Sequence, residues 1–165
     1  MLLKPVLTQM IAYHVTATRK LWDAIEPLGD AVFVTENTYG VGSIRNHMVH
    51  LISVDAAWLN GLRGHPREAF RWIHGEEYAT ISSARAHAEQ VMDDLLTQVQ
   101  AWDEADFVVT SATLSELRWQ VLVHLTTHGV DHRSQVLALV TAAGGISFPQ
   151  DFIMHVWGWP APPQA

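Results

Sequence analysis

The chain has 165 residues, which predicts one domain over residues 1–158 and a loose tail over residues 159–165. It has no cysteine, which excludes disulfides, thiolate zinc sites and a thiol nucleophile, so a metal site would use His, Asp and Glu ligands. A net charge of −7 with 10 scattered lysines and arginines argues against a nucleic-acid partner, and no signal peptide or long apolar segment is present, so we expect a cytoplasmic protein without membrane contact.

Apolar residues recur at helical spacing in four long windows, which predicts an all-α four-helix bundle. We expect the first helix over about residues 5–27. The second should begin after the N-cap Ser43 and end at the breaker Gly64. The third is predicted to run from near Thr80 to about Asp103.

The last third of the chain predicts one long helix and two short elements. The fourth helix should open with the capping box Thr113-Leu-Ser-Glu116 and end at Gly144. The β-prone run Phe107–Thr110 before it predicts one strand of a small hairpin. Within residues 148–157 we expect a short helix that docks aromatic side chains on the bundle.

The fourth predicted helix carries a ladder of three histidines, His124, His128 and His132, at intervals of four residues. Side chains at i and i+4 share one face of a helix, with Cβ atoms roughly 5–6 Å apart, so two adjacent imidazoles can bind one ion. His124 and His132 are separated by about 12 Å of helix rise, which is too far for all three. A helical wheel at about 100° per residue places His128 and His132 within the apolar stripe and His124 at its flank. The inward pair is therefore His128 and His132, and a third ligand must come from elsewhere.

The second predicted helix offers two candidates for this third ligand, His47 and His50. The apolar stripe through Ile44, Leu51 and Trp58 lies closer to His47 than to His50, and it predicts that Trp58 belongs to the core. Periodicity alone therefore slightly favours His47 and does not settle the choice.

A second apolar strip lies on the opposite side of the fourth helix, formed by Trp119, Val123, Val130 and Leu137. A face in contact with water would not be this apolar. Either the C-terminal aromatic residues cover it or a second copy of the protein does, and the two explanations can coexist. We therefore expect a homodimer.

Three motifs follow one another along almost the whole chain: Gly42-Ser-Ile-Arg45, His50-Leu-Ile-Ser-Val-Asp-Ala-Ala-Trp-Leu59 and His124-Leu-Thr-Thr-His128-Gly-Val-Asp-His132-Arg-Ser-Gln135. In this order and spacing the chain resembles the DinB/YfiT-like family of small bacterial four-helix metalloproteins. The resemblance implies that one histidine of the second helix and an H-x-x-x-H pair of the fourth bind a divalent ion.

Carried over by position, these ligands are His50, His128 and His132. The resemblance selects His50 over His47, because the family's ligand lies seven residues after the helix-opening Ser or Thr, as His50 does after Ser43. The family's usual His-Arg-Gly-Gln reads His-Arg-Ser-Gln from His132, a departure that leaves the ligands unchanged.

Three neutral imidazoles suit Zn²⁺ or Ni²⁺, with iron and manganese as further options, and leave a coordination position open, as catalytic sites do. An open position admits water or a thiol, which then loses its proton more readily. Such a site supports two reactions: hydrolysis by the activated water, and transfer of a low-molecular-weight thiol to another molecule. The resemblance implies transfer more strongly, because relatives include bacillithiol S-transferases and mycothiol-dependent enzymes. The chain lacks the Glu after the first His that zincin proteases use as general base.

Four further residues are candidates to line the pocket or support the ligands: His14, His47, His124 and Arg133. Each has a more ordinary interpretation. His14 would be a buried histidine with a satisfied hydrogen bond, His124 a residue at the flank of the helix and Arg133 a partner in a surface salt bridge. Asp131 is expected to face solvent, although a carboxylate can orient a ligand imidazole.

Three functions are compatible with this pattern of histidines. The first is a metal-dependent thiol S-transferase or hydrolase acting on a small electrophilic molecule. The second is a non-catalytic bundle that binds a metal or a small ligand in a stress response, and the third is a structural dimer whose site has lost activity. An open pocket beside the ion favours the enzyme, and a filled coordination sphere favours the other two.

Overall fold

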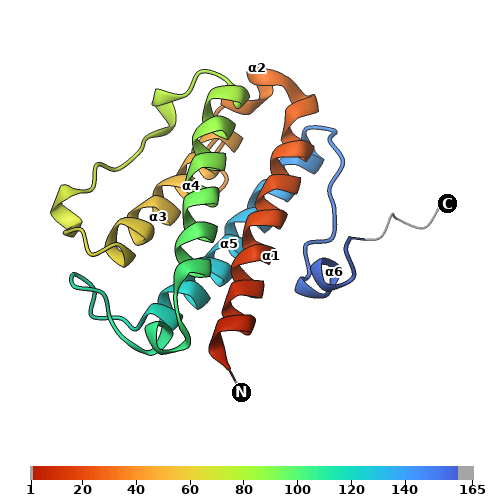
Figure 1. The fold of residues 1–165 in the computed structure, drawn as a ribbon. Helices are drawn as coiled ribbons and strands as arrows, with labels where there is room; N and C mark the ends of the chain where they lie inside the picture. Colours follow the sequence, from red (N-terminus) through yellow and green to blue (C-terminus); the bar gives the residue numbers. More distant parts are fainter. Residues whose placement is uncertain (1, 160–165) are drawn as a thin grey trace.

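The computed structural model describes residues 2–159, and four long helices form its frame (Figure 1). These helices are α1 Leu3–Ile25, α3 Ile44–Leu62, α4 Ile81–Ala101 and α5 Arg118–Ala142. Helices α1 and α3 each contact both α4 and α5, so the four helices close a ring around one core. The prediction of an all-α four-helix bundle is confirmed.

The core is formed by the apolar stripes of the four helices. Fully buried side chains from each helix meet inside the ring, among them Ile11, Leu21, Met48, Leu95 and Leu125. No helix within residues 2–159 is both long enough and apolar enough to cross a membrane.

Two helix starts occur where short polar side chains predict them. The hydroxyl of Ser43 accepts a hydrogen bond from the backbone N–H of Asn46 at 3.2 Å, and the hydroxyl of Thr80 accepts one from Ser83 at 3.2 Å. Both bonds satisfy backbone donors that the first turn of a helix leaves free. The starts of α3 and α4 are therefore encoded locally.

The chain between α1 and α3 contains a helix that periodicity does not predict. After the 3₁₀ turn Glu26–Leu28, helix α2 spans Gly29–Val34. Its only buried side chain, Phe33, packs beside Trp22 of α1 with ring centroids 6.1 Å apart. Six residues are too few for a helical period to be read, and tertiary packing of one aromatic ring stabilises the element.

The expected strand Phe107–Thr110 does not form. Residues Glu104–Val108 are a 3₁₀ helix, η4, in which Phe107 is fully buried against Trp102. The chain does turn back as in a hairpin, but only one isolated antiparallel bridge joins Thr110 to Leu117. Burial of Phe107 therefore outweighs the β-propensity of the run.

Helix α5 begins at Arg118 after the N-cap residue Leu117, four residues later than the capping box with N-cap Thr113 predicted. The Thr113 hydroxyl donates instead to the backbone oxygen of His65 at 2.9 Å, which ties this loop to the loop after α3. The start of the helix is stabilised by Gln120, whose side-chain oxygen accepts from the backbone N–H of Leu117 at 2.8 Å. A tertiary contact has taken the hydroxyl that the local pattern assigned to capping.

The expected short C-terminal helix is present as α6, Phe152–Val156, beside α1 (Figure 1). The ring of Tyr13 on α1 contacts Phe152 edge-on at 5.4 Å and stacks on Trp159 at 6.2 Å. The Tyr13 hydroxyl donates to the backbone oxygen of Gln150. Apart from Trp159, the tail expected over residues 159–165 lies outside the described residues.

Candidate metal centre

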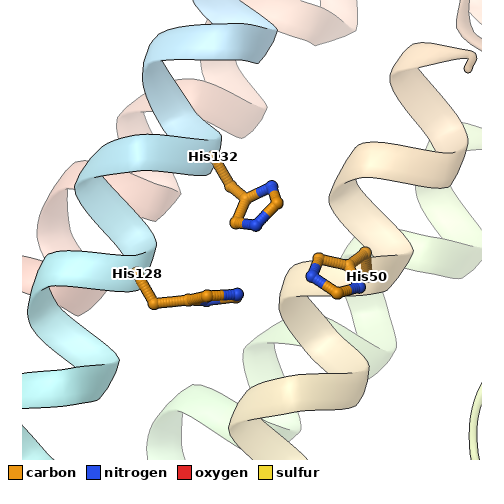
Figure 2. A group of neighbouring side chains, drawn as sticks. All are labelled: His50, His128 and His132. Atoms are coloured by element: carbon orange, nitrogen blue, oxygen red, sulfur yellow. The ribbon is translucent and has the colours of Figure 1, made fainter. Parts of the chain in front are cut away.

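Three histidines meet between α3 and α5. His50 comes from α3, and His128 and His132 come from adjacent turns of α5; Figure 2 shows the three rings pointing toward one another. One nitrogen from each ring can be chosen so that all three lie within 4.8 Å of one another. The three side chains are thus positioned to hold one metal ion.

The geometry of the group follows from the packing of the two helices. His128 and His132 have ring centroids 4.3 Å apart, as expected for side chains four residues apart on one face. The His50 ring lies 4.5 Å from His132 and 5.3 Å from His128 across the interface between the helices. All three side chains are half-buried, so solvent or a small molecule still reaches the group.

His47, which the helical wheel slightly favoured, lies beside the group and not in it. Its side chain is fully buried, and its Nε2 lies 3.2 Å from the backbone oxygen of Tyr39. Its ring is 6.4 Å from His132, whereas the His50 ring is 4.5 Å from it. Periodicity slightly favoured His47, whereas the structure groups His50 with His128 and His132. Helix α3 is buried over a wide arc, so the apolar stripe does not define the side that faces α5.

The surroundings keep the three imidazoles neutral. Burial lowers the pKa of His128 to about 4, with added contributions from the charges that His132 and His50 would carry. Burial also lowers the pKa of His50 and of His132, assisted by His47 in the first case and by His50 in the second. A metal ligand must be deprotonated, so these shifts favour metal binding at neutral pH.

The donor set fits a divalent ion of intermediate softness. Three imidazoles suit zinc, nickel, copper or iron better than calcium or magnesium, which prefer oxygen ligands. The Nδ1 atoms of His128 and His132 are buried without a hydrogen-bond partner among the described residues, so no protein contact already occupies both nitrogens of either ring. These rings are free to coordinate.

A cavity of about 440 Å³ opens beside the group. Its wall includes side chains of α3 and α5 and of the loops that follow α3 and precede α5, and His128 forms part of it. His124 also lines this cavity, with its ring edge-on to Trp58 at 5.3 Å. Trp58, expected in the core, is only partly buried and faces the cavity. The volume is within the range of small-molecule sites.

A buried polar network includes Arg133, the residue that follows the ligand candidate His132 on α5. Nε2 of His14 lies 2.9 Å from Oδ2 of Asp55, and Nδ1 of His14 lies 3.1 Å from Nη1 of Arg133. Arg133 is fully buried, so it forms no surface salt bridge, and neither it nor His14 lines the cavity. Burial lowers the pKa of Arg133. Asp131, two residues earlier, is exposed.

Three residues of this network were not singled out from the sequence: Asp55, Gly129 and Gln150. A Cβ atom on Gly129 would lie 2.4 Å from Nδ1 of His14, so only glycine lets α1 approach α5 here. A glycine in mid-helix and an aspartate within an apolar stripe are signals that the sequence does contain. Gln150, whose side-chain oxygen accepts from Nε of Arg133 at 3.1 Å, carries no local signal.

The fold and site together define a four-helix bundle with a three-histidine group positioned to hold a metal ion. The family model of the DinB family matches residues 2–159, and the chain belongs to this family. A search of the curated proteins found no match.

Proposed function

We propose that this protein is a divalent-metal-dependent enzyme whose metal ligands are His50, His128 and His132. Its reaction is transfer of a small thiol to an electrophilic molecule or hydrolysis of such a molecule. The observation that carries the proposal is the cavity of about 440 Å³ whose wall includes His128. A closed structural or storage site needs no such space beside its ligands.

The chemistry of the proposed centre follows from three protein ligands with further positions open. When bound, a divalent ion in such a site makes a coordinated water or thiol more acidic and a better nucleophile near neutral pH. We expect zinc or nickel, with iron or manganese as alternatives. Family membership supports thiol transfer over hydrolysis, in keeping with the resemblance described above.

The chain's own residues would bind and shield the reactants. Burial keeps His50, His128 and His132 in the neutral form that coordination requires. Trp58 and the loops around the cavity restrict water and give an apolar body a surface to pack against. His124 lines the same space and is placed to contact a substrate.

Metal content tests the assignment of the three metal ligands. Protein purified without a histidine tag should retain about one divalent ion per chain after exhaustive dialysis, measured by plasma mass spectrometry. His50→Ala, His128→Ala and His132→Ala should each lose the ion. His124→Ala is the matched control, because it removes an imidazole one turn away on the same helix and should leave the content unchanged. Equal metal in the wild type and His128→Ala would refute the ligand assignment.

Turnover of substrates tests the proposed enzymatic activity. The metal-loaded protein should consume a small thiol in the presence of electrophiles such as an epoxide or a chloro-nitroaromatic compound, and the chelated protein should not. Inactivity with every cellular thiol and with hydrolysable esters, in a protein shown to hold its ion, would favour the non-catalytic binding bundle.

We also propose a homodimer. Apolar side chains around α6 are exposed, among them Ile153, Val156 and Trp157, and such a group is typical of a contact surface. Sedimentation velocity should give twice the chain mass, and a species of one chain mass at micromolar concentration would exclude the dimer.

A further inference from the structure

The cavity beside the metal centre contains an arginine without a carboxylate partner. Arg67 begins the 3₁₀ turn Arg67–Ala69 in the loop after α3, is exposed and lines the cavity. It forms no ion pair with any described residue. Apart from the buried Arg133, every other arginine is paired with an aspartate or glutamate: Arg19, Arg45, Arg63, Arg71, Arg85 and Arg118.

The absence of a partner at Arg67 stands out because carboxylates are plentiful. The chain has 17 aspartates and glutamates against 10 lysines and arginines, and the immediate neighbour of Arg67 is Glu68. A guanidinium offers five donors in a planar fork that matches a carboxylate. Arg67 therefore presents the cavity with unused donors for an anion.

The same cavity has an aromatic wall. Trp58, Phe70 and Trp72 all line it, and Phe70 contacts Trp72 edge-on with ring centroids 5.4 Å apart. Trp72 is 45% exposed, although burial of an indole would be favourable. A flat apolar group in the cavity would cover this surface.

Charge decides which molecules the cavity favours. Arg67 and Glu116 are its two formally charged lining residues, and histidines 65, 124 and 128 complete its titratable lining. The net charge of −7 repels anions from the protein as a whole, so a bound anion needs a local cation. Arg67 is the cation that the cavity provides.

We propose that the cavity binds a small carboxylate with an aromatic or similarly flat apolar body. The carboxylate pairs with Arg67, and the ring packs against Trp58, Phe70 and Trp72. This inference rests on the proposed function and names its substrate class, because the same cavity reaches the metal centre at His128. A neutral aromatic molecule lacks the Arg67 contact, and an ammonium ion would face repulsion from it.

Binding of three matched probes tests the proposal: naphthalene-2-carboxylate, naphthalene-2-carboxamide and naphthalene-2-methylammonium. Isothermal titration is performed with the protein as purified and again after chelation, and metal content is measured in each sample. Binding to the chelated protein excludes direct coordination of the carboxylate by the ion. Failure of this proposal is therefore distinguishable from failure of the metal assignment, which the metal content alone decides.

Arg67→Gln is the informative variant, because Arg67 is exposed and the substitution keeps a polar side chain. We expect the carboxylate to bind about tenfold more tightly than the carboxamide, and Arg67→Gln to remove most of this difference while leaving the carboxamide unchanged. Arg71→Gln is the matched control, since Arg71 lies four residues along in the same loop, pairs with Glu77 and does not line the cavity.

Four results would overturn the proposal. The first three are no binding of the carboxylate to the chelated protein, equal affinity for carboxylate and carboxamide, and an affinity for the carboxylate that Arg67→Gln leaves unchanged. Tighter binding of the ammonium probe would assign the dominant charge to Glu116 and overturn it as well. Circular dichroism of the Arg67→Gln and Arg71→Gln proteins confirms that each is folded.

Discussion

His14 of α1 donates the hydrogen on its Nε2 to Oδ2 of Asp55 on α3 at 2.9 Å, and both side chains are buried. The hydrogen belongs on Nε2 because Nδ1 faces Nη1 of Arg133, which can only donate. A neutral imidazole therefore connects a buried carboxylate to a buried guanidinium. The network joins α1, α3 and α5 next to His132, so it holds together the two helices that supply the metal ligands.

Asp55→Asn should destabilise the protein by about 3 kcal/mol. The substitution keeps the size of the side chain but removes the charge that offsets buried Arg133. Urea unfolding of the chelated protein measures the change without a contribution from metal binding. Asp131→Asn is the control, because Asp131 is exposed on α5, and it should change stability by less than about 0.5 kcal/mol. Equal stabilities of the two variants would show that the network contributes little.

Gly129→Ala should destabilise the protein by about 2 kcal/mol, although alanine is the better helix former by about 1 kcal/mol. The new Cβ would lie 2.4 Å from Nδ1 of His14 and 2.7 Å from Nη1 of Arg133, so α1 and α5 would have to separate. Thermal unfolding measures the effect. Ala138→Gly, at an exposed position of the same helix, measures the effect of helix propensity on stability without a change in packing. A higher melting temperature for Gly129→Ala would contradict the close approach.

His128 in the chelated protein should titrate with a midpoint near 4, because burial and the neighbouring His132 and His50 lower its pKa from the ordinary 6.5. Between these two values the unfolded chain binds a proton that the folded protein does not. Stability attributable to His128 is therefore intact above pH 6.5 and lost progressively as the pH falls toward 4.

Histidine C–H resonances followed by NMR between pH 3 and 8 measure this midpoint. Urea unfolding over the same range should show a shallower loss of stability on acidification in His128→Gln than in the wild type. A midpoint for His128 near 6.5 would mean that the ring is well hydrated and would remove the argument that the site is prepared for a metal ion.

Gln150→Ala should release the C-terminal segment from the bundle. The Gln150 side chain accepts from Nε of Arg133 at 3.1 Å and donates to the hydroxyl of Ser134 at 2.6 Å. Without it, amide hydrogen exchange over residues 148–158 should become about tenfold faster, while exchange in α3 and α4 stays unchanged. Gln100→Ala, at an exposed position of α4, is the control. Unchanged exchange would show that the aromatic contacts of Tyr13 hold the segment alone.

Local chemistry explains which parts of the fold were predictable. Ser43 and Thr80 cap the helices that follow them, since a hydroxyl reaches a backbone N–H only three residues away. Thr113 does not cap α5, because its hydroxyl donates to the backbone oxygen of His65 in another loop. Helix α2 went unpredicted because its stability comes from burial of Phe33 beside Trp22 and not from its own periodicity.

For the candidate site, the pairing of His128 with His132 was available from the spacing, because the geometry of one helix determines it. The identity of the third histidine could not be predicted from spacing. His47 and His50 lie on the same helix, and the one that meets α5 depends on how α3 is rotated about its axis, which the packing of the whole core decides. Only the resemblance to a family indicated His50 before the structure did.

The amino-acid order alone determined the four long helices, the absence of any cysteine side chain and the inward pair on α5, since each depends on residue type or on spacing of a few residues. The tertiary structure alone decided that His14 meets Asp55 41 residues away and Arg133 119 residues away. It also decided that Arg67 and Trp72 share a cavity with His128. Contacts of this kind arise when helices pack, and packing depends on the fit of all the buried side chains at once.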